Sequence, residues 1–198
     1  MWHEQINNYA SKITMIMKTH ILIAVLGLLS MKVFSQENVV TLSGGYSFSN
    51  IEDTDIKGTG FRISGSYEFN PNSGMLAHGV SIGYIGLKAE ETIGQAEQSY
   101  TINSFPVYYA PKVMFGSDKL KAFVKGALGM QFAGLKREGV VSFNDTDFGF
   151  YGGGGAGVMF FIKGNVFINA EYEIAWASNN WYKDGWINTA MAGIGYKF

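Results

Sequence analysis

The last segment of the chain, Gly185 to Phe198, alternates between two kinds of side chain. One face carries two glycines and a lysine, and the other presents Trp186, Asn188, Ala190, Ala192, Ile194, Tyr196 and Phe198. This alternation predicts a β-strand, because successive side chains of a strand point to opposite faces of a sheet. A soluble protein gains little by exposing Tyr196 and Phe198 on a terminal strand, whereas a strand that faces lipid needs such a surface.

Seven further amphipathic segments precede the last one. The pattern predicts eight strands, at Asn38 to Phe48, Thr59 to Phe69, Leu76 to Lys88, Ser99 to Phe115, Leu120 to Gly134, Thr146 to Ile162, Val166 to Trp176 and Gly185 to Phe198. The fourth segment contains Pro106 and Pro111. Because proline has no amide hydrogen to donate to a neighbouring strand, we expect a bulge or an unpaired site there.

The connections between these strands alternate between polar loops and short turns. The loops are Asn50 to Gly58, Glu90 to Glu97, Lys136 to Asp145 and Ala177 to Asp184, and the turns are Asn70 to Gly74, Gly116 to Lys119 and Lys163 to Asn165. Short turns at one end and longer loops at the other are typical of membrane barrels with an even number of strands. We therefore predict an all-β fold, an eight-stranded antiparallel up-and-down transmembrane β-barrel.

The two faces of the predicted strands differ in charge and in size. The face that carries the charges is also rich in glycine and serine, and small side chains fit the crowded interior of a narrow barrel. The other face holds large side chains such as Tyr84, Phe132 and Trp176, and almost no charge. Since a charge in lipid costs ~2–4 kcal/mol at the midplane, the uncharged face is expected to face outward. A soluble lipocalin-like barrel, the main alternative, would reverse this arrangement.

The charged face would then line the lumen of the barrel. Its members are Arg62, Glu68, Lys121, Lys125, Glu171, Glu173 and Lys197. Buried charges must be paired and hydrogen-bonded. We expect a static network of salt bridges that fills the lumen together with the inward side chains Phe123 and Phe167. A gated ion path is the alternative, and small lumen residues such as Gly153 and Gly193 would favour it by leaving room for water.

Composition agrees with a chain of many strands joined by tight turns. The chain has 26 glycines and only 3 prolines in 198 residues, and 15% of its residues are aromatic. The absence of cysteine excludes a disulfide scaffold. With three lysines in the N-terminal segment, the remainder is acidic overall, which argues against nucleic acid as a partner.

The N-terminal segment has the features of a secretory signal peptide. Lys12 and Lys18 flank a short apolar run, Ile21 to Leu29, and Val33-Phe34-Ser35 fits a cleavage site. The run is too short for a spanning helix, which needs ~20 residues. We predict a signal peptide at 1–35 and a β-barrel domain at 36–198.

The end of the chain resembles the C-terminal assembly signal of bacterial outer-membrane barrels. Phe198, Tyr196 and Gly193 match that signal, and Met191 departs from it, because the family prefers a polar residue there. With the leader and the strand pattern, the chain from Asn38 onward resembles the OmpA/OmpX-type, porin-like eight-stranded barrels of Gram-negative bacteria. The resemblance implies a location in the outer membrane, contact with membrane lipid and lipopolysaccharide, recognition by the barrel-assembly machinery, and a monomer.

Other motifs give no support for catalysis or for a cofactor. Gly152 to Gly157 satisfies the dinucleotide-binding pattern, but the strand-like run Val158 to Ile162 follows it where that motif needs a helix. Of the three histidines only His78 lies outside the leader, and no acidic partner is near it in sequence. The acidic side chains of the loops could bind calcium, but their spacing matches no calcium loop and favours solvated charge. We expect no catalytic residue, no metal site and no cofactor.

One loop offers a candidate contact surface, since Trp181 and Tyr182 lie beside Lys183. These residues could form an interfacial aromatic belt or bind a sugar, a lipid or a host partner. The sequence thus predicts a non-enzymatic outer-membrane barrel that acts as an envelope scaffold or displays surface loops, with a lumen filled by side chains. A narrow porin-like channel is the alternative, and a lipid A-modifying enzyme is a third reading, disfavoured by the lack of a histidine at the loop end.

Overall fold

The structure, a computed structural model, describes residues 37–51, 56–71, 74–93, 96–139 and 142–198. The predicted signal peptide and its cleavage site lie outside the described residues. Nine strands and one 3-10 turn form the described part: β1 (Glu37–Asn50), β2 (Lys57–Asn70), β3 (Leu76–Ile93), β4 (Ala96–Tyr109), β5 (Lys112–Gly116), β6 (Leu120–Glu138), β7 (Phe143–Lys163), β8 (Val166–Ala177), η1 (Lys183–Gly185) and β9 (Trp186–Lys197).

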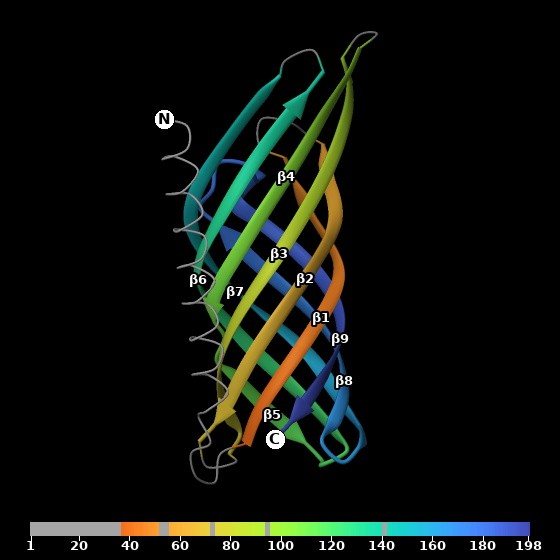
Figure 1. The fold of residues 1–198 in the computed structure, drawn as a ribbon, viewed down its shortest axis with the longest axis vertical. Helices are drawn as coiled ribbons and strands as arrows, with labels where there is room; N and C mark the ends of the chain where they lie inside the picture. The colour runs from red at the N-terminus through yellow and green to blue at the C-terminus, as the bar shows by residue number, and fades with distance from the viewer. Residues whose placement is uncertain (1–36, 52–55, 72–73, 94–95, 140–141) are drawn as a thin grey trace, which may run out of the picture. The chain divides into compact units, whose positions relative to one another are not determined.

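The strands close into a ring in which every neighbour is antiparallel. Apart from β4 and β5, each strand pairs with the next one along the chain, and β1 also pairs with β9, which closes the sheet. β4 and β5 together fill one place between β3 and β6, so the ring has eight strands. Figure 1 shows these strands running obliquely around the barrel. The predicted eight-stranded up-and-down barrel is confirmed.

The two ends of this barrel differ in their connections, and we call them the turn end and the loop end. At the turn end the chain enters β1 and leaves β9, and short connections join β2 to β3, β5 to β6 and β7 to β8. At the loop end lie the connections from β1 to β2, β3 to β4, β6 to β7 and β8 to β9. Among the described residues, no helix is long and apolar enough to cross a membrane.

Both prolines of the fourth segment interrupt the sheet, as predicted. The ladder between β3 and β4 stops after the pair Ile82–Val107 and resumes at Ile85–Ser104, opposite Pro106. Pro111 separates β4 from β5, but its carbonyl still accepts a hydrogen bond of 2.8 Å from the amide of Gly126. The missing proline donors therefore divide the strand in two without opening the barrel wall.

The predicted bounds of two polar loops are wrong, because the strands on either side extend into them. β3 continues to Ile93 and β4 begins at Ala96, so most of the predicted loop Glu90 to Glu97 is a paired hairpin. The predicted loop Lys136 to Asp145 is likewise shortened, because β6 runs to Glu138 and β7 begins at Phe143. Where a hairpin extends past lipid, both faces can be polar, and backbone pairing holds it together without an apolar face.

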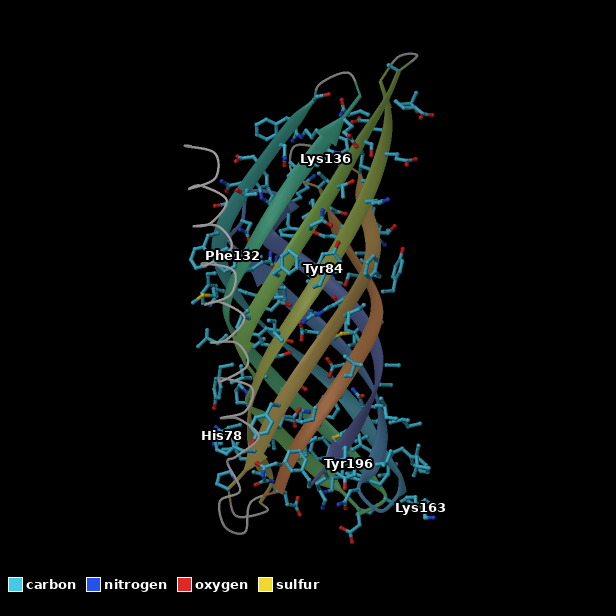
Figure 2. The ribbon with its side chains drawn as sticks, viewed as in Figure 1. His78, Tyr84, Phe132, Lys136, Lys163 and Tyr196 are labelled. Carbon is cyan, nitrogen blue, oxygen red and sulfur yellow. The ribbon has the colours of Figure 1, made fainter. Side chains whose placement is uncertain are left out.

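The side chains alternate between a solvent-screened interior and an exposed apolar exterior. The outward residues Leu42 and Ile82 are 59% and 61% exposed, whereas the inward residues Arg62 and Phe123 are 1% exposed. Figure 2 shows side chains such as Phe132 projecting from the barrel wall. The charge-bearing face lines the interior and the large apolar face points outward. An exterior with this many exposed apolar side chains is that of a membrane barrel and not of a soluble one.

Candidate functional site

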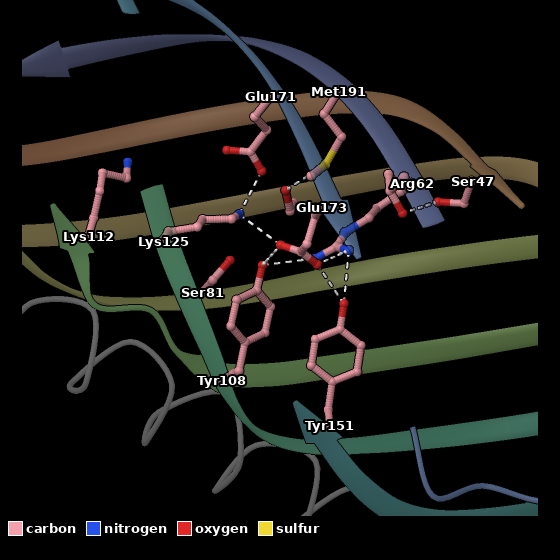
Figure 3. Close-up of polar contacts among 12 residues, drawn as sticks. Ser47, Arg62, Ser81, Tyr108, Lys112, Lys125, Tyr151, Glu171, Glu173 and Met191 are labelled. Carbon is pink, nitrogen blue, oxygen red and sulfur yellow. Dashed lines mark hydrogen bonds and ion pairs between the residues drawn. The ribbon is translucent and has the colours of Figure 1, made fainter. Parts of the chain in front are cut away.

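A layer of charged side chains crosses the interior of the barrel at Glu173 on β8. Arg62 on β2 lies 2.5 Å from one carboxylate oxygen of Glu173, and Tyr151 donates to the same oxygen at 2.7 Å. Tyr108 donates to the other oxygen at 3.1 Å, and Lys125 lies 2.7 Å from it. These groups come from β2, β4, β6 and β7, and Figure 3 shows them converging on one carboxylate. We call Glu173 and these four partners, with Glu171, the charge layer.

The charge layer contains equal numbers of positive and negative groups. Lys125 bridges Glu173 and Glu171, with its Nζ 2.6 Å from the Glu171 carboxylate. Arg62 donates further to the hydroxyls of Tyr151 and Tyr108, at 2.9 and 2.8 Å. Burying a charge is costly unless it is paired and hydrogen-bonded, and each of these four charges has such a partner. The layer therefore occupies this level of the lumen with groups that hold one another in place.

A second pair lies between the charge layer and the turn end. Lys112 on β5 forms a hydrogen-bonded ion pair with Glu68 on β2, and its ammonium lies 4.5 Å from the centre of the Phe123 ring. The sequence prediction missed Lys112, because the register beyond Pro111 was not fixed. Continuing the alternation of β4 through the break would have placed this lysine on the lumen face.

The two remaining predicted lumen charges lie near the rim at the turn end. Lys197 pairs at 3.1 Å with Glu37, and both side chains are about a third exposed. Lys121 lies 5.8 Å from the centre of the Phe161 ring. These lysines are thus separate from the charge layer, and an exposed pair of this kind contributes about 0–1 kcal/mol to stability.

Two phenylalanine rings fill the space over the lumen glycines. A methyl group added at Gly195 would lie 2.1 Å from the Phe167 ring, and one added at Gly157 would lie 2.5 Å from the Phe123 ring. Both rings are 1% exposed. The small lumen residues therefore make room for aromatic rings here rather than for a column of water.

One small polar cavity remains beside these rings. Its volume is about 20 Å³, and Glu68, Lys112 and Asn169 are among its lining residues. Oxygen atoms of Thr41, Glu68 and Asn169 are buried without a protein partner. A cavity of this size holds about one water molecule, so the space suits an isolated water and does not form a passage.

The loop end is closed by the connection between β8 and β9. Tyr182 from this connection is 1% exposed; it donates to the hydroxyl of Ser104 at 3.0 Å and accepts from the Gln131 amide at 3.3 Å. Burial raises the pKa of the Tyr182 phenol to about 12. Its backbone bridges to Ile51 in the connection between β1 and β2. Tyr182 belongs to a buried apolar cluster that also includes Tyr108 and Tyr151 of the charge layer, with Ala110 and Ala175. We call the rest of this cluster the loop-end plug: Ile51, Ile85, Leu87, Ala89, Tyr100, Ile102, Ala127, Leu135, Ala177, Tyr182 and Ile187.

Trp181, Tyr182 and Lys183 were expected to form a surface contact, and this prediction is wrong for Tyr182, which is buried. Tyr182 points into the barrel, because its ring completes the loop-end plug and its hydroxyl finds partners there. For the same reason it is no part of an interfacial aromatic belt. Trp181 packs partly buried against the plug, and Lys183 is partly exposed.

The fold and the order of its faces indicate a membrane barrel, and a comparison with protein families decides which kind. The family model described as outer membrane protein beta-barrel domain matches residues 21–198. The chain belongs to this outer-membrane β-barrel family. It is a protein of the bacterial outer membrane, and the resemblance seen in its sequence is confirmed.

Two solved structures of outer-membrane proteins share the fold. Neisserial surface protein A is 16% identical, with a TM-score of 0.61, and the match covers 83% of this chain and all of that one. A major outer membrane protein from Thermus thermophilus is 10% identical, with a TM-score of 0.54, over 83% of this chain and all of that one. No curated protein matches the sequence. At these low identities the two structures support the fold alone. The role of this family member has to be argued from its own residues.

The residues of the predicted assembly signal lie on the closing strand of this outer-membrane barrel. Tyr196 and Phe198 point outward, half-exposed, with ring centroids 6.2 Å apart. The amide and carbonyl of Phe198 both pair with Asn38, at 2.8 and 3.0 Å. A methyl group added at Gly193 would lie 2.3 Å from the hydroxyl of Ser43 on β1. The three residues thus lie at the seam where β9 meets β1.

His78 lies on the outward face at the turn end, away from the barrel interior. Its ring stacks between Phe69 and Tyr109, and its Nδ1 is 2.5 Å from the Tyr109 hydroxyl. In the described ranges no three side chains of the metal-binding types come together. Three of the acidic loop residues considered as calcium ligands, Glu52, Asp53 and Asp55, lie outside the described residues.

Two members of the charge layer were missed by the sequence analysis because they are uncharged at neutral pH. Tyr108 and Tyr151 are both almost fully buried and both donate to Glu173. Tyr151 follows the inward alternation of β7 between Gly149 and Gly153. A large polar side chain among lumen glycines is the signal that would have found it.

Proposed function

We propose that this protein is a non-conducting, non-enzymatic barrel that serves as a scaffold of the outer membrane and displays its loop end at the cell surface. The observation that carries this proposal is the filling of the lumen at three successive levels. The loop-end plug, the charge layer and the rings of Phe123 and Phe167 each occupy the interior. Eight strands enclose an interior just wide enough for side chains, so three such layers leave no path for water.

The alternative function is a narrow channel for small solutes. It would require the ion pairs around Glu173 to separate, and the loop-end plug to withdraw as well. Separating Arg62 and Lys125 from Glu173 leaves buried charges uncompensated, which costs several kcal/mol for each group. On this proposal the lumen is closed in the resting protein.

The hairpins at the loop end support a display role. β3 with β4 and β6 with β7 remain paired beyond the apolar part of the wall, and the side chains on their outward faces there include Glu90, Lys136 and Glu138. Paired hairpins with polar outward faces present such a surface to water. On this proposal the protein is a monomer that reaches the membrane through the barrel-assembly machinery.

Conductance of the purified protein in a planar bilayer tests the closed lumen. We expect no steady current, and rare small events that become more frequent when Lys125 is replaced by alanine. Large and stable openings of the wild-type protein would establish the channel instead. Mass spectra of lipid A from cells with and without the protein test the non-enzymatic role, and a new lipid A species that depends on the protein would overturn it.

A further inference from the structure

An apolar groove runs across the outside of the barrel, on β4, β6 and β7. Its volume is about 470 Å³, and its lining residues include Phe105, Phe132, Gly134 and Phe148. The three phenylalanines are paired across adjacent strands, Phe105 with Phe132 and Phe132 with Phe148, and each is at least half-exposed. Aromatic side chains of this kind gather where a barrel wall meets the lipid head groups.

The hollow in this wall is made by a row of small and polar residues. One step toward the loop end on the outward face, Asn103 pairs with Gly134 and Gly134 with Thr146. Gly134 has no side chain to cover the phenylalanine rings beneath it. A methyl group added there would meet only Thr146 and a backbone oxygen, at 3.5 and 3.6 Å, so the wall tolerates a larger residue at this position.

Two lysines occupy the next outward row. Lys88 on β3 pairs with Thr101 on β4, which pairs with Lys136 on β6. Because the lysines are two strands apart, their backbones are separated by roughly 10 Å. Figure 2 shows Lys136 above Phe132, on the side of the loop end. The row thus places one cationic side chain above the groove, on β6, and a second beside it, on β3.

Carboxylates also lie near this site. Glu90 and Glu138 occupy the following outward row, and Asp147 lines the groove. Lys136 forms a 2.7 Å ion pair with Glu138, but both side chains are more than half exposed. Such an exposed pair contributes little and is readily exchanged. Lys88 forms no ion pair with another residue of the described chain.

We propose that this groove binds the phosphorylated glycolipid of the outer leaflet, lipid A, with an acyl chain against the phenylalanines and its phosphates on Lys88 and Lys136. An acyl chain needs an apolar wall, which the groove supplies, and a phosphate needs cationic donors at head-group depth. Two separated lysines fit a head group with two phosphates better than one with a single phosphate. The proposal rests on the loop end facing the outer leaflet, and it does not depend on whether the lumen conducts.

Native mass spectrometry of the purified barrel with added diphosphoryl lipid A tests the site. We expect the fraction of protein with bound lipid to fall several-fold in the double variant K88Q/K136Q, and for lipid A whose phosphates have been removed. Gly134→Leu should lower the fraction too, because its side chain fills the groove. Phosphatidylglycerol, which has one phosphate, should bind more weakly than lipid A.

Two matched variants serve as controls. Gly65→Leu adds the same side chain to an outward glycine of β2 where a methyl group meets nothing within 4 Å. Lys119→Gln removes a lysine near the Phe160 ring, a residue of the turn-end half of β7. Both should bind lipid A as the wild type does. Wild-type binding by K88Q/K136Q, an equal loss in Lys119→Gln, or equal binding of phosphatidylglycerol would each overturn the assignment.

Discussion

Replacing Glu173 by glutamine should destabilise the barrel far more than the same change two residues earlier. Glu173 neutralises both Arg62 and Lys125 and accepts hydrogen bonds from Tyr108 and Tyr151. A neutral amide leaves Arg62 buried without a carboxylate. Removing one partner of a buried pair costs about 3–5 kcal/mol, and we expect a loss of that size in the free energy of unfolding.

Glu171→Gln is the matched control for this experiment. Glu171 has the same side chain on the same face of the same strand, and among the described residues it forms an ion pair with Lys125 alone. Lys125 keeps Glu173 as its partner in this variant, so the loss is that of one charged hydrogen bond, about 1.5–3 kcal/mol at most. The two variants therefore differ in whether a buried cation is left without its counter-charge.

Reversible unfolding of the purified barrel in urea, followed by tryptophan fluorescence in detergent micelles or lipid vesicles, measures both losses. The dependence of the free energy on urea should be the same in both variants, because the surface exposed on unfolding is unchanged. If Glu173→Gln is no less stable than Glu171→Gln, the charge layer is not held together by Glu173, and the argument for a static closure fails.

Three further predictions concern the seam, the plug and the orientation. Deleting Phe198 removes the residue whose backbone pairs with Asn38, so the yield of folded barrel in the outer membrane should fall while Phe198→Trp retains it; an undiminished yield would contradict an assembly role. The Tyr182 phenol should ionise near pH 12, seen as the difference in ultraviolet titration between the wild type and Tyr182→Phe. Because its folded pKa lies above the ordinary ~10, its contribution to stability is complete below pH ~10 and is lost as the pH rises toward 12; ionisation at an ordinary phenol pKa would refute its burial. Cysteines at Asn144 and Asn180 should react with an impermeant maleimide on intact cells and cysteines at Ser117 and Gly164 should not, whereas the reverse pattern would invert the orientation.

The sequence predicted the barrel because its membrane-facing strands obey a strict alternation. Lipid excludes charge from one face, and a narrow lumen selects small or paired polar residues on the other, so both faces of β8 and β9 can be read from their residues. The hairpins beyond the membrane escape this rule. Glu90 and Lys136 face water from paired strands, and a polar residue in water indicates neither a strand nor a loop.

The interior was harder to predict than the wall. Periodicity placed Arg62, Lys125 and Glu173 in the lumen, but it does not say which lysine meets which glutamate, since that depends on barrel stagger. Lys112 was lost at the break after Pro111, and Tyr108 and Tyr151 carried no charge to mark them. Tyr182 was misplaced because a loop that folds back into its own barrel has no sequence period.

The contact between Ile51 and Tyr182 has a consequence for how the barrel forms. It joins the first and last connections at the loop end, on the same seam that Ser47 and Thr189 bridge at 2.8 Å and Asn38 and Phe198 close at the turn end. These contacts join residues more than a hundred positions apart, and contacts of such large sequence separation slow folding because a long loop must close first. Burial of the Tyr182 ring thus reports that the barrel has closed at its loop end.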